Sequence, residues 1–270
     1  MSELIRLRRQ GVRLVKMGGT EIGGEAPITI QSMTNTPTWD VAQTVDQIQA
    51  LAEAGCEIIR VAVPTRKDAR SLAKIKEAIA LPLVADIHFN YRLALDALEA
   101  GVDGLRLNPG NIGSQENVRQ VAKKAAKANV PIRIGVNGGS LESDIEEKHG
   151  GATAKALVDS ALRHVGLLEA EGFHDILISL KSSSVRTTLE AYRLMAQKRD
   201  YALHVGVTEA GLGLEGRAKS FLGIGLLLLE GIGETIRISL TGNPVAEIEA
   251  ARSLLASAEA LATSLTGGYQ

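Results

Sequence analysis

Short apolar runs alternate with amphipathic helical patterns along most of this chain. The runs are rich in β-branched residues and occupy positions 27–33, 58–63, 81–87, 104–109, 131–136, 175–181, 202–208 and 235–241. Between them, apolar residues recur at the three-to-four spacing of a helix at 41–53, 68–80, 92–100, 116–128, 154–171, 184–199, 216–229 and 245–262. The pattern predicts eight strands, each followed by a helix.

This rhythm favours a closed barrel of parallel strands. Successive strand starts mostly lie 23 to 33 residues apart, the length of one strand and its crossover helix. The 270 residues are close to the roughly 250 of a single (β/α)8 TIM barrel, which we expect over residues 1–265. An alternating segment at 12–24 predicts an N-terminal β-hairpin across the barrel floor. The glycine-rich, polar segment 137–151 indicates an active-site loop.

Composition narrows the class of protein. Hydrophobic residues make up 45% of the chain and aromatic residues 3%, so the core must consist of Ile, Leu, Val and Ala. Lys and Arg (30) nearly balance Asp and Glu (31), which removes a global electrostatic case for binding nucleic acid or acidic membranes. A single cysteine, Cys56, and the lack of a signal-peptide pattern predict a soluble, cytoplasmic protein.

The predicted strand ends carry unusually polar side chains. In such barrels the reacting groups lie at the carboxyl ends of the strands, where residues two apart share a face. Five cations come from five different strands, and the strands supply few acids, chiefly Asp86 and Glu209. We therefore expect the cations to converge on a polyanion such as a diphosphate, which arginine grips with two parallel hydrogen bonds. These cations are Arg60, Arg106, Arg133, Lys181 and Arg237.

Three other interpretations stay open at this point. Asp86 and His88, with His204, could hold a single metal ion. Lys181 could form a Schiff base with a carbonyl substrate. The glycine run at 211–216 matches a dinucleotide-binding pattern, although its place after the seventh strand favours a loop that closes over a ligand or caps a helix.

The strand-end segments, taken in order, resemble the 4-hydroxy-3-methylbut-2-enyl diphosphate synthases. The resemblance runs in register over essentially the whole chain. It is carried by QSMTNT (31–36), IRVAVPT (59–65), ADIHFNYR (85–92), LRLNPGNIG (105–113), RIGVN (133–137), SLKSS (179–183), GVTEAG (206–211) and TIRISLT (235–241).

The resemblance implies a role for each matching residue. Family members open the ring of methylerythritol cyclodiphosphate and remove a hydroxyl by two-electron reduction, in the non-mevalonate route to isoprenoids. By this resemblance Glu209 is the acidic catalytic residue near the reacting carbons. The expected substrate-binding residues, from the resemblance and from strand alternation together, are Arg60, Asp86, His88, Arg106, Asn108, Arg133, Asn137, Ser179, Lys181, His204, Thr208, Arg237 and Ser239.

One departure from the family pattern is large. The family's [4Fe–4S] cluster is held by three cysteines and a glutamate in a C-terminal domain, and Cys56 matches none of them. We expect a barrel that binds the cyclic diphosphate but holds no cofactor or metal itself, in a homodimeric enzyme served by flavodoxin or ferredoxin. The alternatives are a lysine-dependent or pterin-type barrel acting on a phosphorylated substrate, and a non-catalytic diphosphate-binding module.

Overall fold

The alternating pattern folds into a closed barrel of eight parallel strands. The computed structural model describes residues 7, 9–88, 90–107, 112–208, 211 and 213–266. Within these ranges the strands follow the order β10-β3-β4-β5-β6-β7-β8-β9 around the barrel. They are β3 (Thr29–Met33), β4 (Ile58–Ala62), β5 (Leu83–Ile87), β6 (Gly104–Leu107), β7 (Ile132–Asn137), β8 (Ile176–Lys181), β9 (Ala202–Val205) and β10 (Thr235–Ile236). The predicted (β/α)8 fold is confirmed.

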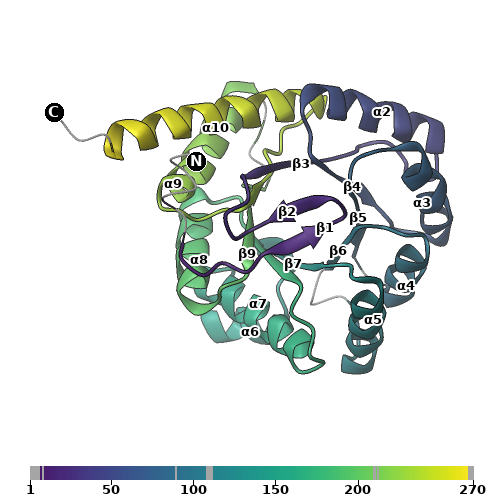
Figure 1. Cartoon of the computed structure of the whole chain (residues 1–270). Helices are drawn as coiled ribbons and strands as arrows, with labels where there is room; N and C mark the ends of the chain where they lie inside the picture. Colours follow the sequence, from purple (N-terminus) through teal and green to yellow (C-terminus); the bar gives the residue numbers. More distant parts are fainter. Residues whose placement is uncertain are drawn as a thin grey trace.

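Helices form a ring outside the strands (Figure 1). Several begin at a side chain that accepts a hydrogen bond from the first turn, as Thr65 does in a capping box with Asp68. The helices are α2 (Val41–Ala54), α3 (Arg66–Ala78), α4 (Tyr91–Glu99), α5 (Gln115–Ala128), α6 (Ser143–His149), α7 (Ala154–Glu169), α8 (Val185–Lys198), α9 (Gly213–Leu229) and α10 (Val245–Thr266). None of the helices in the described ranges is long and apolar enough to cross a membrane.

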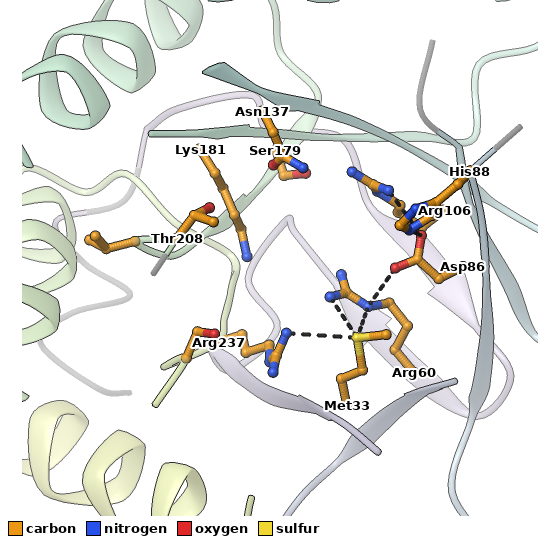
Figure 2. A pocket seen from close by; sticks show the side chains of 12 residues that line it. Met33, Arg60, Asp86, His88, Arg106, Asn137, Ser179, Lys181, Thr208 and Arg237 are labelled. Atoms are coloured by element: carbon orange, nitrogen blue, oxygen red, sulfur yellow. Dashed lines mark hydrogen bonds and ion pairs between the residues drawn. The ribbon is translucent and has the colours of Figure 1, made fainter. Parts of the chain in front are cut away.

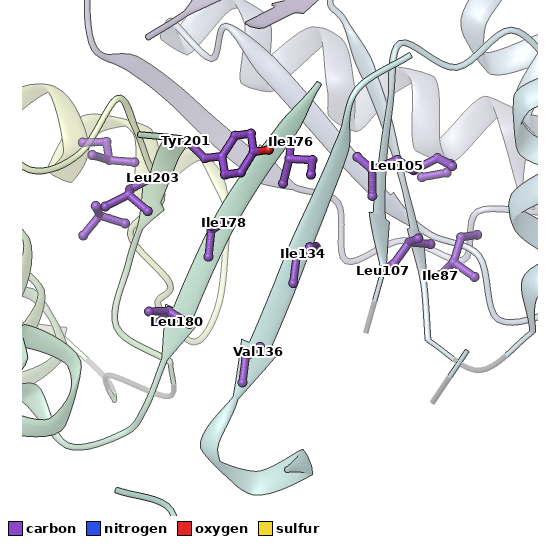
Figure 3. Close-up of a cluster of buried hydrophobic side chains, with 14 of the residues drawn as sticks. Ile87, Leu105, Leu107, Ile134, Val136, Ile176, Ile178, Leu180, Tyr201 and Leu203 are labelled. Carbon is purple, nitrogen blue, oxygen red and sulfur yellow. The ribbon is translucent and has the colours of Figure 1, made fainter. Parts of the chain in front are cut away.

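The main core lies between the barrel wall and the helices. Every second strand residue points outward, and these positions carry Ile, Leu and Val, among them Ile134, Ile178 and Leu203 (Figure 3). Those three side chains are at most 2% exposed. Branched aliphatic residues fill the space that a parallel sheet leaves under its crossover helices, which explains the low aromatic content.

The predicted hairpin closes the amino end of the barrel. Strands β1 (Val15–Met17) and β2 (Thr20–Ile22) pair antiparallel and lie across the barrel in Figure 1. Their buried face joins a second apolar cluster with inward-facing residues from the amino ends of the barrel strands. The cluster consists of Val12, Val15, Met17, Ile22, Ile58, Val84, Leu177 and Ala202. The carboxyl end of the barrel is therefore the end available for a site.

The structure corrects three element predictions. The eighth strand ends at Ile236 rather than 241, because Leu240 donates its backbone N–H to Glu247 on α10 instead of to a neighbouring strand. The seventh ends at Val205 rather than 208. The segment 137–151, expected as a loop, contains the short 3-10 helix η2 (Gly138–Ser140) and α6, whose sequence is too polar and too short to show a helical period.

Met17 joins the hairpin to the amino ends of the barrel strands. Met17 is 2% exposed and packs against Gly104 and Val84, where a side chain on Gly104 would touch the Met17 methyl group. Met17→Ala should lower the free energy of unfolding by about 2 to 5 kcal/mol, because the change leaves a cavity in the floor. Leu14 lies one residue before β1 and is 47% exposed, so Leu14→Ala is the matched control. Urea unfolding that gave equal losses for both variants would show that the hairpin does not support the barrel.

Candidate active site

Register across the parallel ladder brings polar side chains together inside the barrel mouth. Asp86 on β5 is the partner of Arg106 on β6, which is in turn the partner of Arg133 on β7. Four residues beyond Arg133, Asn137 on β7 is the partner of Lys181 on β8. Register partners point to the same side of a sheet, so the inward faces of four strands present one continuous polar surface.

Asp86 is the central carboxylate of this surface. Its oxygens lie 3.3 Å from Arg60 Nε, 3.0 Å from Arg106 Nη1 and 3.2 Å from His88 Nε2. Burial alone would raise the pKa of Asp86, but the charges of Arg60 and Arg106 outweigh burial and hold it well below its usual value. Asp86 therefore stays ionised and keeps two guanidinium groups side by side.

Glu247 is a second buried carboxylate, which the strand pattern does not reveal. It lies in the first turn of α10 and is 3.3 Å from Arg237 Nε, and it accepts a hydrogen bond from Ser32. The sequence signal was only an acidic residue at a helix start, which usually complements the helix dipole. Arg237, predicted as a ligand-binding cation, is therefore partly neutralised by a carboxylate on a helix rather than by one on a strand.

Lys181 differs from Arg60, Arg106 and Arg237, which pair with Asp86 or Glu247. Its ammonium lies 3.5 Å from His204 Nε2, and in the described part of the chain no ion pair joins it to an acid. Burial first, and then the charges of Arg60 and Arg133, lower the pKa of Lys181 well below its ordinary value. Burial, followed by Arg133 and Lys181, also lowers the pKa of His204, so this imidazole is neutral.

Arg133 and His204 lie deeper than predicted. Arg133 is 2% exposed and His204 fully buried, and neither is among the residues that line the cavity described below. Arg133 donates from Nη1 to Gln31 Oε1 at 2.6 Å, whereas its Nε and Nη2 have no partner among the described residues. These two residues form the layer beneath the cavity floor.

The other predicted residues with described positions meet around one cavity of about 190 Å³ at the carboxyl end of the strands. Figure 2 shows Lys181 at the end of β8, Arg60 on β4 and Arg237 just after β10 reaching into the same space. The predicted residues that line it are Arg60, Asp86, His88, Arg106, Asn137, Ser179, Lys181, Thr208, Arg237 and Ser239. Predicted residues Asn108 and Glu209 lie outside the described residues.

Met33 is a lining residue that the sequence reasoning missed. Its sulfur accepts hydrogen bonds from Arg60 at 3.1 and 3.2 Å, and lies 3.8 Å from Arg237 Nη1. The available signal was positional, since Met33 ends the first barrel strand two residues after Gln31 and therefore shares its face. A thioether bridges the two guanidinium groups without adding charge.

A second hollow of about 490 Å³ adjoins the cavity. The two share Asn137, Lys181 and Thr208, and the second is bounded by the η2 turn and by Ser182 and Ser183 before α8. Lys181 thus lies at the junction of the two spaces and lines both of them.

Two glycines make room for the cations. A side chain at Gly135 would overlap the Arg106 guanidinium, and one at Gly206 would come within 3.0 Å of Lys181 Nζ and 2.6 Å of the Arg237 carbonyl oxygen. In the described residues, five cations face two buried carboxylates, Asp86 and Glu247, which leaves an excess of positive charge. The arrangement suits a compact ligand that carries several negative charges.

The metal interpretation is not supported by the geometry. Asp86 and His88 are in contact, but His204 lies beside Lys181 instead. Among the described residues, no three His, Cys, Asp or Glu side chains are grouped so that they could hold a metal ion. Asp86 is occupied by two guanidinium groups.

Comparison with solved structures supports the fold. A dihydropteroate synthase from Stenotrophomonas maltophilia superposes with a TM-score of 0.65 at 13% identity, covering 90% of this chain and 97% of that one. The spore coat polysaccharide biosynthesis protein spsE from Bacillus subtilis gives a TM-score of 0.63 at 13% identity, covering 93% and 74%. At such identities the likeness concerns the barrel alone.

Comparison of sequences identifies the family. The chain is 55% identical over 252 residues to the 4-hydroxy-3-methylbut-2-en-1-yl diphosphate synthase (flavodoxin) of Caldanaerobacter subterraneus subsp. tengcongensis, covering 93% of this chain and 71% of that protein. It is 56% identical to the enzyme of the same name from Clostridium tetani, covering 89% and 69%. The model of the GcpE TIM-barrel domain matches residues 12–252. This chain therefore belongs to the GcpE TIM-barrel family.

Proposed function

We propose that this chain is the substrate-binding barrel of a 4-hydroxy-3-methylbut-2-enyl diphosphate synthase, and that its mouth binds the diphosphate of methylerythritol cyclodiphosphate. The observation that carries the proposal is that, among the described residues, five inward cations face only two buried carboxylates, Asp86 and Glu247. Unpaired buried charge is costly, so a site of this kind is stabilised by an anionic ligand. The family relationship favours this function over the lysine-dependent and pterin-type alternatives.

The cations have different roles in binding the ligand. Arg60 and Arg106 are held together by Asp86 and present fixed N–H groups to one phosphate. Lys181, which has no acidic partner among the described residues, supplies a charge that the ligand must neutralise. Ser179 and Asn137 add neutral donors on the same wall of the cavity. A rigid, pre-arranged set of donors binds a diphosphate with little loss of side-chain freedom.

Arg133 and His204 act from beneath the floor in this proposal. Nε and Nη2 of Arg133, which have no hydrogen-bond partner among the described residues, are available for a ligand oxygen that enters the cavity more deeply, or for the side chains that line it. By the family resemblance, Asn108 joins the diphosphate contacts and Glu209 supplies a proton near the reacting carbons. Both follow barrel strands, β6 and β9, that end at the mouth.

The iron–sulfur cluster implied by the family does not fit the residues of this chain. The sole cysteine, Cys56, is buried between α2 and β4, at the end of the barrel opposite the cavity, and its S–H donates to the Ile58 carbonyl at 3.1 Å. Burial raises the pKa of the Cys56 thiol to about 11, so it is not the thiolate that iron requires. We propose that the cluster ligands come from polypeptide outside this sequence.

The whole enzyme is then a two-part system. The barrel binds and orients the cyclic diphosphate, and a reduced cluster supplies electrons for the reductive ring opening. The names of the relatives point to flavodoxin as electron donor. We further propose a cytoplasmic homodimer, the assembly that the family resemblance implies.

Binding of pyrophosphate tests the site directly. Pyrophosphate and the cyclic diphosphate should each raise the melting temperature of the chain, because a ligand that binds only the folded state stabilises it by mass action. Added salt should reduce the effect through screening. Lys181→Met, which removes the charge but keeps the length, should weaken binding by about 1.5 to 3 kcal/mol while leaving the unfolding free energy equal or higher.

The control is Lys219→Met, a surface lysine paired with Glu215 on α9. In calorimetric titration, Lys219→Met should bind pyrophosphate with the same affinity as the unmodified chain. If neither ligand binds at millimolar concentration, or if Lys181→Met binds as tightly as the unmodified chain, the diphosphate site is wrong.

Asp86 should determine the acid stability of the site. Asp86→Asn leaves two buried guanidinium groups uncompensated and should cost about 3 to 5 kcal/mol at pH 7. The folded-state pKa of Asp86 lies below its unfolded value, so its contribution is complete above the unfolded pKa of about 4 and disappears as pH falls toward the folded pKa. The difference between the two proteins should therefore shrink below about pH 4.

Urea unfolding from pH 7 to pH 3 measures this difference. Glu190→Gln, which breaks the exposed pair with Arg186 on α8, is the control and should change stability little at any pH. A small, pH-independent effect of Asp86→Asn would mean that Asp86 does not organise the cations.

A further inference from the structure

The ladder between β8 and β9 is interrupted at the barrel mouth by a side-chain hydroxyl. The two strands pair as Leu177 with Ala202 and Ile178 with Leu203. Continued for two more residues, this register would direct the Leu180 N–H to the His204 carbonyl. Instead Leu180 donates to the Tyr192 hydroxyl at 3.0 Å, and that hydroxyl donates to the His204 carbonyl at 2.5 Å.

Tyrosine suits this position because its hydroxyl both accepts and donates. Tyr192 projects from α8, is fully buried, and satisfies both backbone groups that the widened ladder would otherwise leave unpaired. Burial raises the pKa of the Tyr192 hydroxyl, so it retains the proton that it donates. A phenylalanine would fill the same space and satisfy neither group.

The inserted Tyr192 hydroxyl lies beside Lys181, which has no acidic partner in the described part of the chain. Lys181 directly follows Leu180, and His204, whose carbonyl accepts from Tyr192, places its ring nitrogen 3.5 Å from the Lys181 ammonium. On the β9 side, Gly206 leaves the space that the lysine chain occupies. The separation of β8 from β9 therefore sets where the Lys181 ammonium lies relative to the cavity and the adjoining hollow.

We propose that Tyr192 is a positioning residue for the anion site. Its hydroxyl holds β8 and β9 apart at the mouth and so directs Lys181 toward the ligand. This inference rests on the proposed diphosphate site and adds a residue that touches neither the ligand nor the cavity. Without the hydroxyl, the Leu180 N–H and the His204 carbonyl approach each other, and Lys181 moves with its strand.

Tyr201 provides a matched control within the same core. It is 1% exposed, and its hydroxyl donates to Glu169 at 3.0 Å and lies 3.2 Å from His174 Nδ1. These partners belong to α7 and to the segment before β8, at the amino end of the barrel. Tyr201→Phe therefore removes a tyrosine hydroxyl from the same core without changing the mouth.

A double-mutant cycle on pyrophosphate affinity tests the inference. Tyr192→Phe should weaken binding about tenfold in the unmodified background, and less than about twofold in the Lys181→Met background, because its effect passes through Lys181. Tyr201→Phe should leave the affinity unchanged even if it lowers the melting temperature as much as Tyr192→Phe does. A Tyr192→Phe effect that is equal in both backgrounds, or an affinity within twofold of the unmodified chain, would overturn the proposal.

Two further outcomes are distinguishable. If the unmodified chain fails to bind pyrophosphate, the diphosphate site itself is wrong and this inference falls with it. If Tyr192→Phe does not fold, 3-fluorotyrosine incorporated into the unmodified chain provides the second measurement by fluorine NMR, with signals assigned from the other single Tyr→Phe variants. Pyrophosphate should shift the Tyr192 signal but not the Tyr201 signal, and an unmoved Tyr192 signal would reject the positioning role.

Discussion

The burial of five cations inside one barrel is the constraint on which the rest of the structure depends. A charge taken from water costs several kcal/mol unless it is paired. Asp86 and Glu247 pay part of that cost by binding Arg60, Arg106 and Arg237. The remainder is borne by the apolar packing between barrel wall and helices, which must be extensive enough to keep the strands closed around groups that repel one another.

Alternation of side chains along each strand separates the apolar packing from the buried charges. Outward residues such as Ile134 and Ile178 belong to the apolar core, while Arg133 and Ser179, on the same strands, face inward. A change in register by one residue would exchange the two sets, so stability and charge placement specify the same register. Gly135 and Gly206 serve the same placement of charge, because the absence of a side chain at each position leaves space for a cation.

Much of the fold and part of the site follow from local sequence patterns. Eight repeats of a strand and a helix, with a period of two within each strand, predicted the barrel, the hairpin and the inward set from Arg60 to Ser239. What local patterns could not predict depends on contacts between distant segments. Glu247 joins Arg237 only because α10 packs back against the barrel beside β3, and Tyr192 enters the β8–β9 ladder from a helix. The depth of Arg133 and His204 depends on barrel tilt and stagger, which alternation does not encode.

The hairpin floor has a kinetic consequence. Because β1 and β2 pack against the amino ends of the strands, the cavity opens toward the carboxyl end. In the proposed function, substrate arrives and product leaves through the same opening, and the two events must alternate. Occupancy by product would then delay the next cycle, and the lifetime of the bound diphosphate, rather than its affinity alone, would limit turnover.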